Sequence, residues 1–414
     1  MSGPAHRSFG ALRHPGFRVF FVCQALAMMA DVIEHAISYW VVFQKFHSAA
    51  LGGFAVISHW LPFLTLSMYT GGLADRLDPR RIIQAGMLLF IGVSLSWGWL
   101  FLSGTMQMWH ACVLLIVHGL AGVLWSPAAA LLLHDMVGHE DLPSAVRLGA
   151  TARYLGMLVG PWLGALLLHS LGPVVGIFLN ALIYLPMTLW LVGAPYGPKF
   201  RAAGVVHARA VRGLKEVVAT LRVIRGKPVL LSMTLLAGAA SFFIGNAYQA
   251  QMPGFATDLG HGDPGIAYGA LLGADALGAF TGGLVLESRG FLTARPATAC
   301  VLAGLWCLAL GGFALAHDYP VVLVLLFIAG FSELSFASMA QALVQLNAPV
   351  ELRGHVIGVY VMAGLGMRMF SGFFVGLLGS VIGTHYSLAL SCLGMLLCAF
   401  LLSRRFWHAP AHAH

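Results

Sequence analysis

Long apolar runs alternate with short polar stretches along the whole chain. A helix needs about 20 residues to cross a bilayer, and twelve segments of this kind are predicted, at residues 17–44, 50–74, 81–102, 107–133, 144–170, 173–193, 228–250, 265–288, 294–316, 320–346, 353–380 and 382–403. A membrane β-barrel would instead show alternating segments of about ten residues. The pattern therefore predicts an all-α polytopic membrane protein.

The longest polar stretch, residues 194–227, divides the chain into six-helix halves at 1–193 and 228–414. Apolar residues at helical spacing lie among arginines and lysines in this linker: Leu214, Val217, Val218, Leu221 and Ile224. Two interpretations stay open. The stretch is either an amphipathic helix on the inner membrane surface or a basic linker that only sets topology.

Short matches recur between the halves at a constant separation. Gly71-Gly72-Leu73 matches Gly282-Gly283-Leu284, and Gly119 matches Gly330. This indicates a duplicated six-helix unit, an architecture of transporters whose substrate site lies where the halves meet near the bilayer midplane.

Composition strengthens the membrane prediction. Of the 414 residues, 59% are hydrophobic and 9% are charged, whereas a soluble domain carries about 25% charged residues. Soluble globular, disordered and coiled-coil proteins are excluded. The six cysteines all lie inside apolar runs and are interpreted as packing residues.

The net charge of +8 is interpreted as a topology signal. With a cytoplasmic N-terminus, nearly all of the 23 Lys and Arg lie in or beside cytoplasmic loops and tails. The exceptions are Lys45, outside, and Arg153 and Arg368, within helices. We expect a multi-pass protein of a bacterial inner membrane with both termini cytoplasmic, attracted to anionic lipid headgroups. The charge gives no reason to expect nucleic acid as a partner.

Six charged residues lie within the predicted spans and away from the span ends: Asp31, Glu34, Asp275, Glu333, Arg153 and Arg368. A charge at the centre of a membrane helix costs at least about 2.5–3.5 kcal/mol on insertion scales. These side chains should therefore face the bundle interior or a wet cavity, and they are candidates for function.

Polar residues of the first span lie along one face of the helix. Asp31, Glu34 and His35 share this face with Gln24 and Ser38. We expect a cavity wall that binds protons, with the two acids titrating as a coupled pair and one of them protonated during part of a transport cycle. The alternative is a fixed ion pair between one of these acids and Arg153 or Arg368.

The other polar residues within spans leave several pairings open. For Asp275 and Glu333 the alternatives are binding of protons or substrate and simple hydrogen bonding to neighbouring helices. For Arg368 the alternatives are neutralisation of one of these acids and binding of an anionic substrate. Arg153 is a candidate partner of Asp31. Interhelical hydrogen bonding is favoured over ligand binding for His59, His118 and Asn246.

None of the six cysteines has the spacing of a metal-ligand set. The tail residues His408, His412 and His414 are interpreted as a disordered chain end, and a weak metal site is the alternative. We expect neither a metal site nor a cofactor.

One loop carries a family resemblance. Gly71-Gly72-Leu73-Ala74-Asp75-Arg76-Leu77-Asp78-Pro79-Arg80-Arg81 resembles the loop motif of the major facilitator superfamily, with Asp78 and Pro79 at positions where the motif has glycine and often a basic residue. Trp125-Ser126-Pro127-Ala128-Ala129 is similar to the enterobactin-exporter and drug-efflux branch. The resemblance implies twelve helices in two bundles, alternating access and a functional monomer. It also implies that Gly71, Asp75, Arg76 and Arg80 form a conformational latch; the alternative is a charge cluster that only holds topology.

A second motif lies in the fifth segment. Gly156, Gly160, Pro161 and Gly164 resemble the glycine-proline motif of superfamily antiporters. Glycines four apart also permit close helix packing without any role in antiport.

These observations predict a secondary transporter, interpreted as a proton-coupled exporter of small amphipathic compounds such as drugs, siderophores or metabolites. Proton-coupled uptake, by symport, and facilitated transport are the alternatives, because the same carboxylates would serve symport. A membrane enzyme is disfavoured because the predicted spans and the loops between them contain no Gly-x-Ser-x-Gly, no phosphate loop and no metal-binding histidine pair four residues apart. A sensor or scaffold is disfavoured because the charges within the spans are retained.

Overall fold

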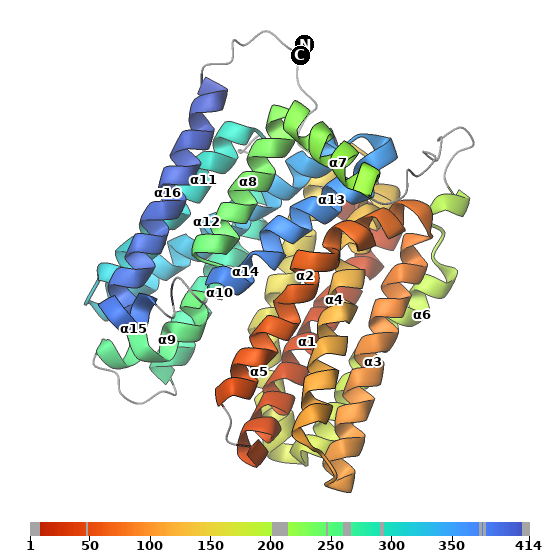
Figure 1. Cartoon of the computed structure of the whole chain (residues 1–414), viewed down its shortest axis with the longest axis vertical. Helices are drawn as coiled ribbons and strands as arrows, with labels where there is room; N and C mark the ends of the chain where they lie inside the picture. The colour runs from red at the N-terminus through yellow and green to blue at the C-terminus, as the bar shows by residue number, and fades with distance from the viewer. Residues whose placement is uncertain are drawn as a thin grey trace.

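The computed structural model describes residues 9–46, 49–200, 214–245, 247–259, 266–289, 294–371, 375 and 378–407. In these ranges the chain forms helices and turns without a β-strand. Two helical bundles lie side by side, one from each half of the sequence (Figure 1). The predicted all-α class and the two-bundle arrangement are confirmed.

The helices of the first bundle are α1 (Pro15–Phe46), α2 (Ala49–Arg76), α3 (Pro79–Ser103), α4 (Met108–Val137), α5 (Leu142–Ile183) and α6 (Leu185–Gly193), with short turns η1 (Gly10–Arg13) and η2 (Pro198–Phe200) at its ends. The second bundle contains α8 (Pro228–Phe243), α9 (Ala247–Asp258), α10 (Ile266–Arg289), α11 (Pro296–Leu315), α12 (Tyr319–Asn347), η3 (Val350–Leu352), α13 (Arg353–Val361), η4 (Met362–Gly366), α14 (Arg368–Ser371), α15 (Leu378–Ile382) and α16 (Thr384–Trp407).

Nine helices in the described ranges are long and apolar enough to cross a membrane. The remaining predicted segments, 50–74, 144–170 and 353–380, correspond to α2, the first part of α5, and α13 to α14. These three are rich in glycine and polar residues, and they contribute much of the contact between the bundles.

Two predicted segments, 144–170 and 173–193, run through a single helical stretch with a break at Gly172. This residue has φ 76° and ψ 168°, values outside the helical region, and Pro173 follows it. Glycine tolerates a positive φ and proline cannot donate a backbone hydrogen bond. The local sequence therefore turns the chain between two spans without a polar loop.

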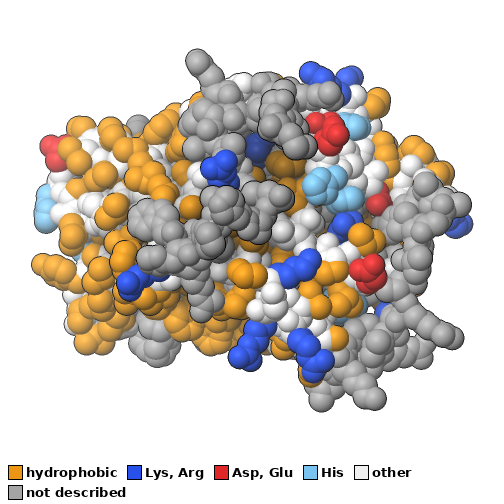
Figure 2. All heavy atoms as spheres, turned by 90° about the horizontal axis from the view of Figure 1, so that it is seen from above, with side chains coloured by type: hydrophobic (Ala, Val, Ile, Leu, Met, Phe, Trp, Pro, Cys, Tyr) orange, Lys and Arg blue, Asp and Glu red, His pale blue; other side chains and the backbone are white. Residues whose placement is uncertain are grey.

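The bundles meet at one end of the molecule, which we call the linker end. It comprises the end of α2, the start of α5, the end of α10, the start of α13, and α7 (Leu214–Gly226) from the linker. In Figure 1 the linker end is at the top, and α9 and α15 lie at the opposite end. Figure 2 looks onto the linker end and shows several groups of Lys and Arg side chains on this face.

The predicted linker helix forms as α7. Ile224 is buried against the second bundle, whereas Val218 and Leu221 are about half exposed. Its apolar residues thus serve partly in packing, and contact with a membrane surface remains a prediction. Arg212 lies outside the described residues.

The matches between the halves correspond to equivalent packing. Gly119 on α4 lies against the Ser58 carbonyl oxygen of α2, and Gly330 on α12 lies against the Asp275 carbonyl oxygen of α10. A Cβ at either glycine would overlap with that oxygen, so both positions require the smallest residue.

Candidate functional site

A cavity of about 480 Å³ lies between the bundles. Its volume falls within the range of about 300–1,000 Å³ that is usual for small-molecule sites. Charged and imidazole side chains from both halves line it: Asp31, His35, His59, Arg153, Glu333 and Arg368. Aromatic side chains form much of the remaining wall: Trp60, Phe63, Trp125, Trp306 and Phe336. Such a cavity accommodates a compound with both apolar surface and charge.

His118 bridges the two acids of α1. Its Nε2 lies 2.8 Å from Asp31 Oδ1 and its Nδ1 lies 2.8 Å from Glu34 Oε1. A neutral imidazole has only one N–H to donate. Two short contacts to carboxylates therefore require either an imidazolium or a protonated carboxyl group. His118, Asp31 and Glu34 together thus hold at least one exchangeable proton more than a neutral imidazole and two carboxylates would.

The polar face of α1 is divided between the cavity and the bundle interior. Asp31 and His35 line the cavity, whereas Glu34 is 2% exposed and accepts a hydrogen bond from Ser94 on α3. Asn180 in turn donates to Ser94 over 3.4 Å. The expectation that Glu34 forms part of the cavity wall is wrong, because the turn of the helix places this carboxylate among α3, α4 and α5.

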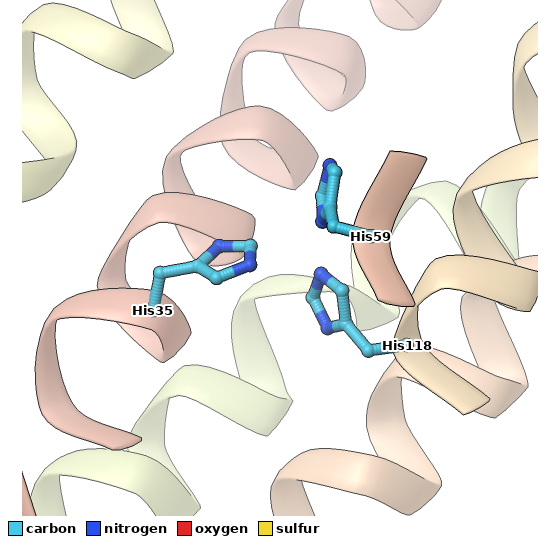
Figure 3. A group of neighbouring side chains, drawn as sticks. All are labelled: His35, His59 and His118. Atoms are coloured by element: carbon cyan, nitrogen blue, oxygen red, sulfur yellow. The ribbon is translucent and has the colours of Figure 1, made fainter. Parts of the chain in front are cut away.

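Three histidines from different helices meet beside Asp31 (Figure 3). They are His35 on α1, His59 on α2 and His118 on α4, and one ligand nitrogen of each lies within 4.8 Å of the other two. The Nδ1 atom of His35 lies 2.8 Å from the Asp31 carbonyl oxygen. The Nδ1 atom of His59 is buried without a hydrogen-bond partner.

A second polar cluster lies on the opposite bundle. Tyr248 of α9 donates to Asp275 Oδ2 over 3.0 Å and is 3.4 Å from Glu333 Oε2. Gln249 donates to the same Asp275 oxygen over 3.2 Å. Asp275 and Glu333 are thus connected through one tyrosine hydroxyl, and only Glu333 and Gln249 line the cavity.

The two arginines within the spans line the cavity without an ion pair among the described residues. The guanidinium of Arg368 lies over the Trp60 ring, 5.0 Å from its centroid, and joins the two bundles through this cation–π contact. Arg368 follows the π-helical turn η4, and its Nε is buried without a hydrogen-bond partner. The alternative in which Asp31 or Glu34 forms a fixed ion pair with an arginine is not realised, since both acids contact His118.

Asp75 connects the bundles at the linker end. Its Oδ1 accepts from the Gly354 backbone N–H over 2.7 Å, and its Oδ2 accepts from the His355 N–H over 3.1 Å. The first turn of a helix leaves backbone N–H groups free and favours a negative charge. Asp75 therefore caps α13 of the opposite bundle. Gly71 lies against the Gly354 carbonyl oxygen, where a Cβ would overlap.

Arg80 does not take part in this contact between bundles. It pairs with Asp78 over 2.6 Å and donates to the Ala194 carbonyl oxygen, all within the first half. Asp78 also caps α3, accepting from the Arg80 N–H over 3.0 Å, with Pro79 as the first helical residue. The departures from the family motif thus form an ordinary helix start.

A second connection at the linker end was missed by the sequence reasoning. Glu287 of α10 is fully buried, and its Oε2 lies 2.8 Å from Arg147 of α5. Ser144 donates to the other oxygen of Glu287. Both charged residues lie near predicted segment ends, where solvent exposure is the ordinary expectation.

The glycines of α5 form a packing surface for α1. A Cβ at Gly156 would lie 2.7 Å from the Ala25 carbonyl oxygen, one at Gly160 would lie 2.8 Å from Val32 Cβ, and one at Gly164 would lie 3.0 Å from Ala36 Cβ. Pro161 is exposed on the other side of the helix. The close approach of α1 and α5 fixes Asp31 in the bundle, whereas a role of this motif in antiport remains a prediction.

Several residues in or beside the cavity carried only weak sequence signals. His59 and His118 were expected to form interhelical hydrogen bonds rather than to bind a ligand, and His118 does contact two acids of α1. Tyr154, Tyr248 and Gln249 were not singled out. A polar residue within an apolar run was the available signal for the histidines. Asn246 and the tail histidines lie outside the described residues.

Comparison with known proteins connects this architecture to transport. Residues 6–410 match the family model described as transmembrane secretion effector. The multidrug efflux pump Tap of Mycolicibacterium fortuitum is 26% identical over 380 residues, covering 86% of this chain and 88% of Tap. The enterobactin exporter EntS of Shigella boydii serotype 4 is 24% identical over 415 residues, covering 96% of this chain and 94% of EntS.

Solved structures share the fold. The human organic anion transporter MFSD10 superposes with a TM-score of 0.75 at 16% identity, covering 95% of this chain and 99% of that chain. The fucose:proton symporter FucP of E. coli gives a TM-score of 0.71 at 13% identity, covering 96% and 99%. Both have the twelve-helix, two-bundle fold of the major facilitator superfamily.

Proposed function

The chain belongs to the transmembrane secretion effector family of the major facilitator superfamily, and from this premise we propose that it is a proton-coupled exporter of small amphipathic compounds. One observation carries the proposal: a cavity lined by acids, bases and aromatic rings of both bundles is closed at the linker end by contacts between the bundles. Such contacts can exchange when two rigid bundles rotate against each other, which is the basis of alternating access.

The described contacts between bundles support a cavity that opens away from the linker end. The cross-bundle glycine contacts run along α2 from Leu64, near its middle, to Gly72 at the linker end, and a further contact at this end joins Gly283 of α10 to Thr151 of α5. If this end is cytoplasmic, as the distribution of Lys and Arg predicts, the structure is the outward-facing state.

Proton coupling is assigned to the carboxylates of both bundles. Asp31, with Glu34 and His118, holds a shared proton in the first bundle, and Asp275 with Glu333 forms the corresponding acidic pair in the second. Export requires that a proton entering from outside and the substrate leaving the cavity compete for these groups. Arg153 and Arg368 would contact an anionic part of the substrate, and the aromatic wall its apolar part.

The direction of transport rests on the relatives that are named efflux pump and exporter. Uptake by symport is the competing function, because FucP shares the fold and is a proton symporter. The site chemistry is compatible with either direction.

Inside-out membrane vesicles with an acidified lumen and a pH-reporting dye test the proposal. We would add a panel of lipophilic cations and catecholates and compare the wild type with Asp31→Asn and Asp275→Asn. Compound-dependent proton efflux from the lumen, lost in Asp31→Asn, is the expected result. Asp258→Asn, an exposed acid on α9, is the matched control and should retain the signal.

Proton movement in the same direction as the compound would instead establish symport. Compound flux without proton movement would reduce the function to facilitated transport. Flux that survives in both Asp31→Asn and Asp275→Asn would remove these acids from the coupling mechanism.

A further inference from the structure

The cluster of His35, His59 and His118 is larger than hydrogen bonding between helices requires. The three residues come from α1, α2 and α4, and their ligand nitrogens lie within 4.8 Å of one another. Their rings point toward a common centre (Figure 3). His35 and His59 line the cavity, so the centre is accessible from it. We propose that these three histidines, with Asp31, bind a divalent transition-metal ion of the Zn²⁺, Co²⁺ and Ni²⁺ class.

The ligand set matches this class of ion. Imidazole nitrogen is a preferred donor for zinc, cobalt and nickel, and three histidines with one oxygen donor form a familiar four-coordinate zinc shell. Asp31 Oδ1 lies 2.8 Å from His118 Nε2 and supplies the oxygen. Nitrogens around a tetrahedral zinc ion are about 3.4 Å apart, given bonds of about 2.0–2.1 Å. The ligand nitrogens lie within 4.8 Å of one another in the structure, and rotation of the three rings about their side-chain torsions would bring them to this spacing.

The surrounding groups orient the rings as metal ligands require. Histidine ligands usually donate their second N–H to a carboxylate or a backbone carbonyl, which fixes the tautomer. His35 Nδ1 lies 2.8 Å from the Asp31 carbonyl oxygen, which leaves Nε2 free to coordinate. His118 Nδ1 lies 2.8 Å from Glu34, which leaves Nε2 for the metal once its contact with Asp31 is exchanged. Glu34 is therefore a positioning residue in this site.

Charge balance supports a dication at this position. Asp31 and Glu34 carry two negative charges when both are ionised, and a divalent ion with three neutral imidazoles neutralises them. A single imidazolium would offset only one of these charges. The Nδ1 atom of His59 is buried without a hydrogen-bond partner. Coordination of a metal ion, directly or after rotation of the His59 ring, would satisfy that nitrogen.

One nearby charge opposes metal binding. The Arg368 guanidinium lies over Trp60, which directly follows His59 in the chain. Its removal should therefore tighten binding, whereas loss of a ligand weakens it. Opposite effects from two residues on the cavity wall would distinguish coordination from a general change in folding.

The test is a titration of the full-length purified protein with Co²⁺, followed by visible absorption, using an affinity tag that contains no histidine. We expect one Co²⁺ per chain with the intense bands of four-coordinate cobalt, displaced by Zn²⁺. His59→Ala should weaken the affinity about 100-fold, Glu34→Gln about 10- to 100-fold, and Arg368→Gln should strengthen it. His169→Ala, an exposed histidine on α5, is the matched control.

A variant in which His408, His412 and His414 are changed to alanine tests chelation by the tail. Loss of binding only in that variant would overturn the proposal, as would no spectral change up to about 1 mM Co²⁺. Size-exclusion profiles identify variants that fail to fold. For the wild type itself, zinc X-ray absorption should show nitrogen and oxygen donors at about 2.0–2.1 Å, and an all-oxygen six-coordinate shell would overturn the site. None of these measurements depends on transport, so the proposed export and this site can fail separately.

Discussion

Asp75 Oδ2 accepts two hydrogen bonds from His355, one from the backbone N–H at 3.1 Å and one from ring Nδ1 at 2.9 Å. The two residues belong to different bundles and are 280 positions apart in the chain. A single carboxylate therefore caps a helix and binds a side chain across the interface on which alternating access depends.

Asp75→Ala should open the linker end. It removes the hydrogen bonds to Gly354 and His355, and each hydrogen bond to a charged group contributes about 1.5–3 kcal/mol, so we expect at least a tenfold shift in the balance of states. The opening is measured by maleimide labelling of a Thr151→Cys probe in a variant that lacks the six native cysteines. Thr151 is buried in this interface, against Gly283 of α10. Asp75→Ala should label faster than the protein with Asp75 intact, whereas the control Glu351→Gln should label at an unchanged rate. Equal labelling rates in Asp75→Ala and Glu351→Gln would show that Asp75 does not hold the bundles together.

Gly71→Ala should open the same interface by steric overlap. The added methyl group would lie far inside van der Waals contact with the Gly354 carbonyl oxygen, so α2 and α13 must separate. Gly92→Ala is the matched control, because no atom lies within 4 Å of the position of its Cβ. The Thr151→Cys probe should label faster only in the first variant, and closure retained in Gly71→Ala would contradict the tight packing.

Arg147→Ala should destabilise the protein more than the double substitution Arg147→Ala with Glu287→Gln. The single change leaves a fully buried carboxylate without its cation, and breaking a buried pair in this way typically costs about 3–5 kcal/mol. The double change also removes the uncompensated charge. Thermal unfolding in detergent, with all four members of the double-mutant cycle, gives the coupling energy. Additive effects would argue against a coupled pair.

The contribution of Asp78 to stability should depend on pH. Burial raises the pKa of this carboxyl group, but hydrogen bonds from the Arg80 side chain and backbone outweigh burial and lower the pKa below its ordinary value. A lowered pKa in the folded state adds stability above the unfolded value of about 3.9, and this stability is lost as the pH falls toward the folded value. Asp78→Asn should therefore lower the melting temperature at pH 7 and have a smaller effect near pH 3; a constant difference would indicate a contribution independent of charge.

The sequence by itself determined the fold class, since apolar runs of membrane-spanning length leave helices as the way to satisfy the backbone in lipid. It also identified the acids of the cavity, because a charge within such a run must be buried in protein or water. Gly71 and Asp75 were recognised by a motif, whereas the cap that Asp78 forms for α3 was seen only in the structure.

Only the tertiary structure decided which of these residues meet. Asp31 contacts His118 rather than an arginine, and the Arg147–Glu287 pair joins segments 140 residues apart. The gathering of His35, His59 and His118 has no counterpart in sequence spacing, because each residue comes from a different helix. Helical periodicity determines the face on which a residue lies, whereas the packing of helices against one another determines its partner.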